Sequence, residues 1–587
     1  MTAVRQLTAV FCCFAATALF AQTTRSTRKT TKTAAQPTTV TTAPTAEANA
    51  QTTTAPATPP VIAETDRDVN NPRAMRLSLD DAIKTAMERN VGIQVSRYDY
   101  RASGEALRSQ YGLYDWIGTA DLERGSQKAP ALTAVQASSS TDAIANFGIQ
   151  QTIPTGGTYN FGFNNIKSTA SGGFTKFSPS YKSGLGFSLA QPVMRNFGVD
   201  VTQRGINIAR DTLGINHDAF RQTLLDTTNS VEQAYLDLVY ARQFVDVVKE
   251  ASFLARDQAR ITQIRIDVGA SDPLDFLQPR VQIATEEENL INAEAAVRNA
   301  EDNLRTLLHL DPADWDRPIL PTDTVGYMPF SVNVQEAVNR AYDLRPELHE
   351  LQLTMDTARI QNLYARNQTL PQVDLKLNYN MSGIAGRELQ FDPITGLPTG
   401  NFISNTGYTN ALSQVLGTNY PSWTFALNVG LPITNVGARA EAKRTELEMG
   451  RARSNEELTR QNIALQVRTA VRAIDTAAKN ITAAKTARDA AEQNLEAERR
   501  RYENGMATNF EVLQIQQQLS SARATELQSL IGYNKALTAY HRAVGDLLDV
   551  HNVRVEDEQV QEPKVPHFFT SLQHYNWLNF DTTPAAK

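Results

Sequence analysis

The sequence GASDPLDFLQ at residues 269–278 recurs as GMATNFEVLQ at residues 505–514. In each copy a glycine follows a long run of heptad-spaced apolar residues. A residue able to cap a helix comes three places later, Asp272 in the first copy and Thr508 in the second. Glycine supplies the backbone freedom that ends one helix, and the capping side chain begins the next. Both copies therefore predict a tight turn between two long helices.

Long helices are predicted on both sides of these turns. Residues 202–267 and residues 439–503 place apolar side chains at spacings of three, four and seven, as packed helices do. At about 1.5 Å per residue, each stretch would span on the order of 100 Å. Residues 272–310 and 509–548 are expected to return alongside them. Small residues dominate the apolar positions, which favours helices packed side by side into a wall.

Two more pairs of matching stretches occur in the same order. Residues 79–86 parallel residues 334–341, and residues 191–193 parallel residues 431–433. Repetition at so long a period predicts two equivalent halves, each with a helix, strands, a very long helix, a tight turn and a returning helix. The expected boundaries are residues 73–320 for the first half and residues 321–550 for the second.

Stretches with a period of two lie between the helices. Apolar side chains alternate with polar or small ones in residues 371–381, 422–433, 159–163 and 185–189, and aromatic residues lie on the apolar side. One such stretch alone would fit a soluble sheet with one buried face. Four of them, together with an export signal and two helical hairpins, favour membrane β-strands.

The first half has further strand-like sequence at residues 116–122 and 147–153. The second of these stretches is joined to the next strand by Pro-Thr-Gly-Gly at residues 154–157. An added hairpin is one interpretation, so the strand count of the first half stays open. The sequence otherwise predicts about four strands per chain.

Both ends of the chain have their own character. Residues 1–21 combine Arg5, an apolar stretch too short to span a bilayer and a small residue at the expected cleavage point, which predicts a signal peptide. Residues 22–72 are rich in Thr, Ala and Pro, so we expect a disordered leader that acts as a tether, or whose basic start contacts a membrane or peptidoglycan. Residues 551–587 are expected to form a polar and aromatic C-terminal extension.

Composition excludes several classes of function. A net charge of −6 does not suggest a nucleic-acid partner. The seven histidines and nine methionines form no cluster, so no metal and no cofactor are expected. Residues 154–157 lack the lysine of a phosphate loop, and no catalytic group of residues is found, so the chain is not expected to be an enzyme. Glu286, Glu287 and Glu288 are expected on a solvated helix face. Apart from the N-terminus no long apolar run occurs, which excludes a bundle of membrane-spanning helices.

Four strands cannot close a barrel, because even the smallest filled barrels need about eight. An open sheet edge in hydrocarbon would leave backbone groups unpaired. The barrel must therefore be shared between chains, and three copies would supply twelve strands. The expected fold is a mixed α and β membrane protein, with a shared trimeric β-barrel that continues into a long α-helical barrel.

Residues 188–193, 234–238, 268–275 and 501–505 together resemble the TolC family of outer-membrane efflux proteins, and the resemblance covers residues 77–550. It implies a homotrimer with a twelve-stranded barrel in the outer membrane of a Gram-negative-type bacterium, in contact with its lipid. It further implies a periplasmic helical tunnel closed at its inner tip. The implied partners are a periplasmic membrane-fusion adaptor and an inner-membrane pump or ABC exporter.

Site residues follow partly from the pattern and partly from the resemblance. Pro192 and Pro432 fall where strand gives way to helix, and the resemblance places the junction of barrel and tunnel there. The resemblance places Tyr502 at the position of a gate aromatic, and Glu511 and Gln514 where the family has acidic rings. Because Gln514 is uncharged, only one acidic ring, at Glu511, is supported. An ordinary solvated helix face is the alternative for Glu511. The residues implied in adaptor contact are Gly269, Ser271, Asp272, Pro273, Leu274, Gly505, Ala507 and Thr508.

The leading functional hypothesis is a passive exit duct in a tripartite efflux pump. The same architecture would serve type I protein secretion, and the sequence does not separate the two. A hypothesis from another class is a structural protein, a trimeric coiled-coil stalk with a membrane anchor. The internal repeat speaks against it, since a stalk needs no second hairpin and strand pair. No residue identifies the transported substrate.

Overall fold

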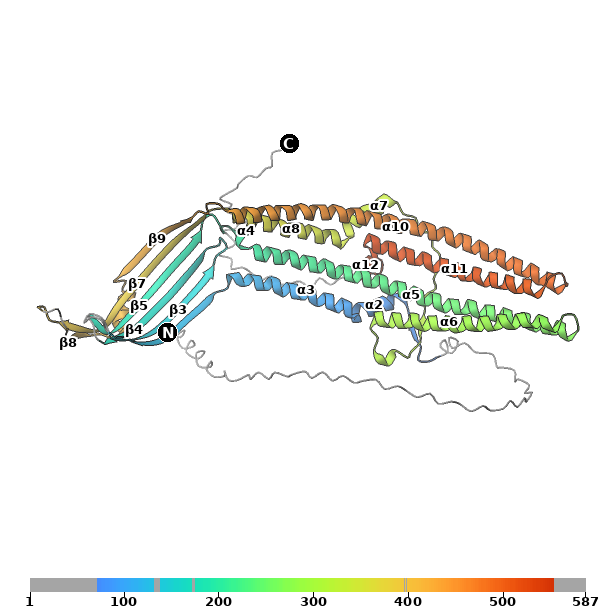
Figure 1. The fold of residues 1–587 in the computed structure, drawn as a ribbon, viewed down its shortest axis with the longest axis horizontal. Coiled ribbons are helices and arrows are strands. Elements are labelled where there is room, and N and C mark those ends of the chain that lie inside the picture. The colour runs from blue at the N-terminus through green and yellow to red at the C-terminus, as the bar shows by residue number, and fades with distance from the viewer. Residues whose placement is uncertain (1–70, 131–137, 172–174, 395, 397, 554–587) are drawn as a thin grey trace, which may run out of the picture. The chain divides into compact units, whose positions relative to one another are not determined.

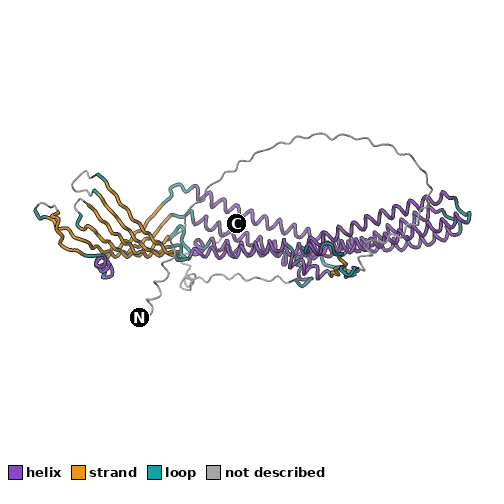
Figure 2. Tube along the Cα trace, turned by 90° about the horizontal axis from the view of Figure 1, so that it is seen from below, coloured by secondary structure: helices purple, strands orange, loops and turns teal. Residues whose placement is uncertain are grey.

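The computed structural model describes residues 71–130, 138–171, 175–394, 396 and 398–553. The predicted signal peptide, nearly all of the predicted leader, and residues 554–587 of the predicted C-terminal extension lie outside the described residues. Within the described part, most of the strands gather at one end and the long helices continue from them (Figures 1 and 2). No helix among the described residues is long and apolar enough to cross a membrane.

The long helices form where the heptad spacing predicts them. In the first half α5 covers Arg204–Asp267 and α6 returns over Leu277–Leu308; in the second half α10 covers Val436–Glu503 and α11 returns over Asn509–Val544. Shorter helices precede the strands of each half: α2 (Leu79–Arg89), α3 (Val91–Gln110), α7 (Val334–Leu344) and α8 (Pro346–Asn367). The remaining short helices are α4 (Val199–Thr202), α9 (Tyr408–Leu416), α12 (Leu547–Val550) and three 3₁₀ turns at Tyr111–Tyr114, Pro273–Phe276 and Pro312–Asp314.

Neighbouring helices form one layer whose order is α3, α5, α8 and α10, while α6 and α11 extend it toward the hairpin tips. The predicted apolar positions of α5 are buried, among them Ala234, Leu238 and Val245, and they pack against Val297 and other residues of α6. Small and branched side chains at these positions allow the helix backbones to approach closely. The predicted wall of packed helices is therefore confirmed within this chain.

The strands form one seven-stranded antiparallel sheet. They are β2 (Ile117–Lys128), β3 (Ser139–Thr152), β4 (Thr158–Ser171), β5 (Phe177–Pro192), β7 (Gln372–Phe391), β8 (Pro398–Asn405) and β9 (Pro421–Gly430). Six of them lie side by side next to the helices, in the order β2, β3, β4, β5, β7 and β9, because β8 pairs only with the far part of β7.

The predicted count of about four strands is therefore wrong, and the added hairpin of the first half is real. The alternation that identified the other strands is weak in β2 and β3, because their charged and apolar residues do not follow a period of two. Strand β2 carries Asp121, Glu123 and Arg124, and β3 places Ile144 on the face opposite Phe147. Strand β8 and helix α9 were not predicted either. Helix α9 is fastened to the sheet, since the Ile384 backbone N–H donates to Gln414 Oε1 at 3.0 Å.

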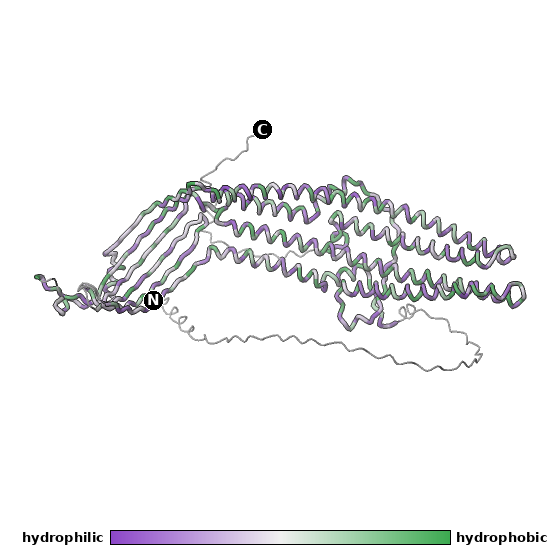
Figure 3. The backbone as a smooth tube through the Cα atoms, viewed as in Figure 1, coloured by the Kyte–Doolittle hydropathy of each residue, from purple (hydrophilic) through white to green (hydrophobic). Residues whose placement is uncertain are grey.

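Hydrophobic and hydrophilic residues are interleaved along the strands (Figure 3). The register of the strands places them on two different faces. One row across the sheet consists of the exposed apolar residues Ile149, Phe161, Phe187, Tyr379 and Trp423. The adjacent row, on the opposite face, consists of Gly148, Gly162, Gly186, Asn380 and Ser422. At this level of the sheet, one face is thus apolar and aromatic, and the other is small and polar.

A short parallel pair of strands, which the sequence did not predict, crosses the helix layer. Strand β1 (Met75–Leu77) pairs with β6 (Ile319–Pro321). The buried Tyr235 of α5 holds the pair in place, because its hydroxyl lies 3.1 Å from the Leu77 carbonyl oxygen and 2.8 Å from Asp323 Oδ2. This contact joins the N-terminal residues of the first half to the segment that leads into the second half.

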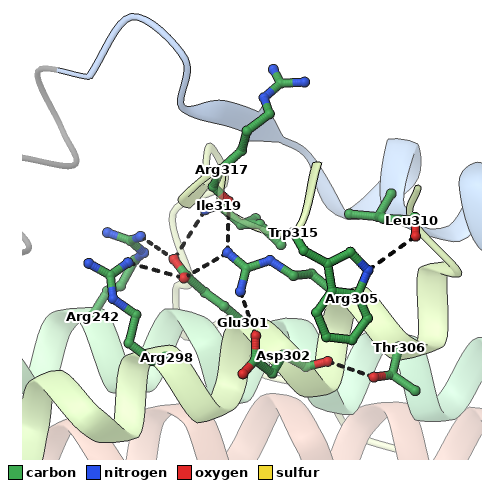
Figure 4. A network of polar contacts seen from close by, with 10 residues as sticks. All are labelled: Arg242, Arg298, Glu301, Asp302, Arg305, Thr306, Leu310, Trp315, Arg317 and Ile319. Carbon is green, nitrogen blue, oxygen red and sulfur yellow. Dashed lines mark hydrogen bonds and ion pairs between the residues drawn. The ribbon is translucent and has the colours of Figure 1, made fainter. Parts of the chain in front are cut away.

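A buried carboxylate beside β6 is the centre of a network of polar contacts (Figure 4). Glu301 of α6 is fully buried, and its oxygens accept from Arg242 at 2.6 Å, from Arg305 at 3.0 Å and from Arg298 at 3.3 Å. The same carboxylate accepts from the Ile319 backbone N–H at 3.1 Å. Glu301 therefore connects α5, α6 and β6 through one charge.

We predict that Glu301→Gln destabilises the protein strongly, because three guanidinium groups then lose their common anion. Breaking a buried ion pair by removing one partner costs about 3–5 kcal/mol. The measurement is the urea midpoint for loss of helical circular dichroism in detergent. Asp302→Asn is the matched control: Asp302 pairs with the same Arg305 at 2.7 Å but is 56% exposed, so its loss should cost little. Equal midpoints for the two variants would show that the buried Glu301 carboxylate does not stabilise the network.

Candidate functional site

The two helix-hairpin tips have the turn chemistry that the sequence predicts. Gly269 and Gly505 adopt positive φ angles of 77° and 74°, which side chains with a Cβ rarely adopt. In the first tip Asp272 caps the next turn by accepting from the Leu274 backbone N–H at 2.8 Å. In the second tip Thr508 caps α11. Both turns are therefore held by local backbone and capping interactions.

Apolar side chains project from both tips. Leu274, which the sequence singled out, is 69% exposed, and Met506 and Phe510 are 64% and 57% exposed. Ser271 and Ala507 are half-buried beside them, and Pro273 begins the 3₁₀ turn. Met506 and Phe510 were not among the predicted contact residues, although both lie within the repeated stretch that predicted the turn.

Tyr502, one predicted gate residue, lies between the two hairpins. Its side chain is buried against Leu495, Val512 and Leu519. The Arg265 guanidinium of the first hairpin stacks over the ring at 4.5 Å and donates to the Tyr502 carbonyl oxygen at 2.7 Å. A cation held over an aromatic face contributes to the contact as well as the hydrogen bond. Tyr502 thus fastens the second tip to the first.

The other two predicted gate residues, Glu511 and Gln514, lie exposed on one face of α11, with buried Val512 and Leu513 between them. Glu511 Oε2 accepts from the Thr508 backbone N–H at 2.7 Å and from its hydroxyl at 3.0 Å, and the Glu511 N–H donates back to Thr508 Oγ1 at 3.3 Å. This is a capping box. The bond from the Thr508 backbone, then the bond from its side chain, holds the pKa of Glu511 below its usual range, so the exposed carboxylate stays charged.

Buried polar residues of the two hairpins form a hydrogen-bonded contact that the sequence did not predict. Asn509 Oδ1 accepts from Gln258 Nε2 at 2.8 Å and from the Thr262 hydroxyl at 3.3 Å, and all three side chains are buried. Arg499 pairs with Asp257 at 2.8 Å at the edge of the same contact. The available signal was the polar residues at positions that face a neighbouring helix. The sequence did not indicate their partners, since Gln258 and Asn509 lie 251 residues apart.

The strand-to-helix junctions lie where the two prolines predicted them. Pro192 is the last residue of β5, and the next residue, Val193, still donates to the Val373 carbonyl oxygen at 2.8 Å. Pro432 lies between the end of β9 and the beginning of α10. Proline suits the end of a hydrogen-bonded ladder, because it has no N–H to donate.

The expectation of a solvated acidic face at residues 286–288 is wrong in part. Glu286 is only 6% exposed and accepts from Gln282 at 2.7 Å and from Asn289 at 3.2 Å. Glu287 is half-exposed and pairs with Arg256 at 3.0 Å across to α5, and Glu288 is exposed. The packing of α6 against α5 decides which acidic residue is buried, and three consecutive acidic residues carry no such information.

Comparison with known proteins identifies relatives of this arrangement. The family model "Outer membrane efflux protein" matches residues 124–309 and 337–546. The CmeC outer membrane channel of Campylobacter jejuni is similar with a TM-score of 0.57 and 15% identity, over 84% of this chain and 89% of that chain. The outer membrane protein VceC of Vibrio cholerae is similar with a TM-score of 0.56 and 13% identity, over 80% of this chain and 96% of that chain.

A sheet that continues into long helical hairpins is the fold of outer-membrane channels. The chain belongs to the outer membrane efflux protein family, as the resemblance in its sequence implied, and it is a protein of the outer membrane. The toxin and drug export protein A of Aggregatibacter actinomycetemcomitans is 27% identical over 166 residues. That match spans 27% of this chain and 35% of the relative's length.

We predict that Asn509→Ala loosens the second tip, because Gln258 then keeps a buried amide without its partner. Leaving a buried polar group unsatisfied costs about 1–3 kcal/mol, which corresponds to roughly fivefold to 150-fold faster amide exchange where that contact limits opening. Hydrogen exchange of residues 503–511 measures it. Asn504→Ala is the control, since Asn504 is exposed and bonds only within its own helix, to the Arg500 carbonyl oxygen. Unchanged exchange in Asn509→Ala would show that this contact does not hold the tip.

Proposed function

We propose that the chain is one of three copies that together form a passive exit duct. The three sheets would close a shared barrel in the outer membrane, and the helix layers would form a periplasmic tunnel below it. The tunnel would be closed at the hairpin tips. In this proposal the two halves of each chain are structural repeats, since the same order of helix pair, strands, long helix, tip and returning helix occurs in each.

The observation that carries the proposal is a sheet with one apolar face and two open edges. In the part of the chain that the structure describes, the outer edges of β2 and β9 have no strand partner. Hydrocarbon offers no hydrogen bonds to unpaired backbone groups, so a lipid-exposed sheet is stable only when its edges are joined. Pairing of β2 with β9 of a neighbouring copy satisfies both edges. With six strands side by side in each copy, three copies would close eighteen strands, in place of the expected twelve.

The tips are the proposed contact with the rest of an export machine. Exposed Leu274, Met506 and Phe510 offer apolar anchors at the periplasmic end, where a membrane-fusion adaptor would dock. An inner-membrane pump or ABC exporter would supply the energy. The relative named for toxin and drug export is consistent with either small molecules or polypeptides as cargo.

The proposed gate is the second tip. Its bonds to the first hairpin, through Tyr502 and Asn509, give it one held position, and release of these bonds would let the tip move. In three copies around one axis, the charged and exposed Glu511 side chains would form an acidic ring that attracts cations. Gln514 would lie on the same face one helical turn further on.

We predict that the detergent-solubilised protein is a trimer in which β2 of one copy pairs with β9 of the next. Both cysteines of the chain lie in the predicted signal peptide, so they do not compete with introduced ones. Cysteines introduced at Thr119 and Ser422 should then form disulfides between copies. Neighbouring positions are tested as well, because the register between β2 and β9 of two copies is not fixed by the structure of one chain. Bridged residues have Cα atoms about 4.4–6.8 Å apart. Cysteines at Gln150 and Ser422 are the control, because Gln150 lies one strand inside the edge. A folded monomer in light scattering would contradict the shared barrel.

We predict that Glu511→Gln lowers the cation preference of single channels in planar bilayers. Glutamine also serves at this position of a capping box, so the variant removes the charge while it keeps the cap. Glu511→Ala removes both and separates the two effects. Glu288→Gln on α6 is the control for loss of an exposed charge elsewhere. Unchanged selectivity in Glu511→Gln, or an equal change in the control, would place Glu511 outside the gate.

A further inference from the structure

The hairpin of β3 and β4 lies in the sheet between two strands, β2 and β5, whose adjoining helices contact each other directly. Strand β2 follows α3, and β5 leads into α4 and α5, while α3 and α5 pack directly against each other. Strands β3 and β4 fill the space between β2 and β5 in the sheet. Six strands therefore adjoin the layer of four helices, α3, α5, α8 and α10.

The hairpin is built into the sheet along its whole length. Every residue of β2 has a partner in β3, and β4 pairs with β3 and β5 over nearly the same span. Its faces continue those of the other strands, with Phe147 and Phe161 on the apolar face and Gly148 and Gly162 on the polar face. It is therefore a section of the wall and continues both surfaces of the sheet.

The turn at residues 153–157 is fastened on both sides. On one side Gln191 Nε2 donates to the Thr155 carbonyl oxygen at 3.1 Å, and the Gly198 N–H donates to the same oxygen at 3.2 Å. On the other side Gln151 Nε2 donates to the Tyr114 carbonyl oxygen at 2.7 Å, just after α3. A Cβ on Gly156 would lie 2.3 Å from the Asn196 carbonyl oxygen, so this close approach requires glycine. The hairpin is thus anchored to the segments that lead from both helices.

The width of six strands matches the width of four helices. Strands about 4.8 Å apart and tilted by about 40° each take about 6 Å of a barrel's rim. Six strands then cover about 38 Å and four cover about 25 Å, whereas four helices packed about 8–10 Å apart cover about 32–40 Å. Closed by three copies, eighteen strands give a backbone diameter of about 36 Å, against about 24 Å for twelve.

We propose that the β3–β4 hairpin sets the bore of the exit. With it, the barrel is about as wide as the helical tunnel, so the duct has no second constriction at the membrane and releases large hydrophilic molecules, including polypeptide chains. On the polar face, the row of Gly148, Gly162 and Gly186 keeps one level of this bore free of bulky side chains. The inference rests on the proposed three-copy duct and specifies the size of its cargo.

The test measures the bore from outside, so that the closed tip does not limit it. A cysteine replaces Asn378, which lies on the polar face of β7 near the helices, in a chain whose own cysteines both lie within residues 1–21. Intact cells are labelled with maleimides carrying polyethylene glycols of increasing size. The same cysteine is placed in a variant that lacks residues 139–171, in which β2 and β5 become neighbours with their faces unchanged.

The expected result is that Asn378→Cys reacts with large reagents in the full chain and only with small ones in the shortened variant. An equal size limit in both overturns the proposal on the bore and leaves the duct intact. Tyr379→Cys, on the apolar face, should stay unlabelled. Labelling of Tyr379→Cys in place of Asn378→Cys would instead overturn the duct itself, since the polar face would not line a lumen.

A second measurement covers the case in which the shortened variant does not fold. Electron microscopy of the full-length protein in detergent should show eighteen strands and a barrel about as wide as the tunnel. A twelve-stranded barrel with β3 and β4 outside the wall would overturn the proposal.

Discussion

Backbone hydrogen bonding at the edges of the sheet is the constraint on which the rest of the molecule depends. The sheet exposes aromatic and aliphatic side chains on one face, and a surface of this kind is stable against lipid only when the backbone is fully paired. Within the described residues, β2 and β9 each keep one open edge. The proposed assembly therefore follows from these edges more directly than from any single side chain.

The helix layer answers a different requirement, close packing over a long distance. Buried positions on α5 and α10 are occupied largely by alanine, valine, leucine and isoleucine, which give stability without directional contacts. Directional contacts occur at several places, two of which bear on β6 and on the tips. Glu301 and its three arginines lie beside β6, and the buried amides of Gln258 and Asn509 lie near the tips. A tip that moves, as proposed for the gate, is best held by directional contacts, because a few hydrogen bonds are enough to fix it or release it.

The junction between sheet and helices links these two requirements. Strands and helices have different widths, so a wall that passes from one to the other must match their numbers or change its diameter. The β3–β4 hairpin, anchored through Thr155 and Gln151, supplies the matching strands here. In the proposed assembly, this hairpin thereby sets the diameter of the whole barrel.

By itself, the sequence determined the features that depend on neighbours a few residues apart. These are the long helices, the glycine turns with their caps at Asp272 and Thr508, the alternating strands, and the family. Only the tertiary structure decided the strand count, the burial of Glu286, and the position of Tyr502 between two hairpins. The physical reason is distance along the chain. Pairing in a sheet and contact between hairpins join residues such as Gln258 and Asn509, 251 positions apart, and no local period records which partner a strand edge or a buried amide will meet.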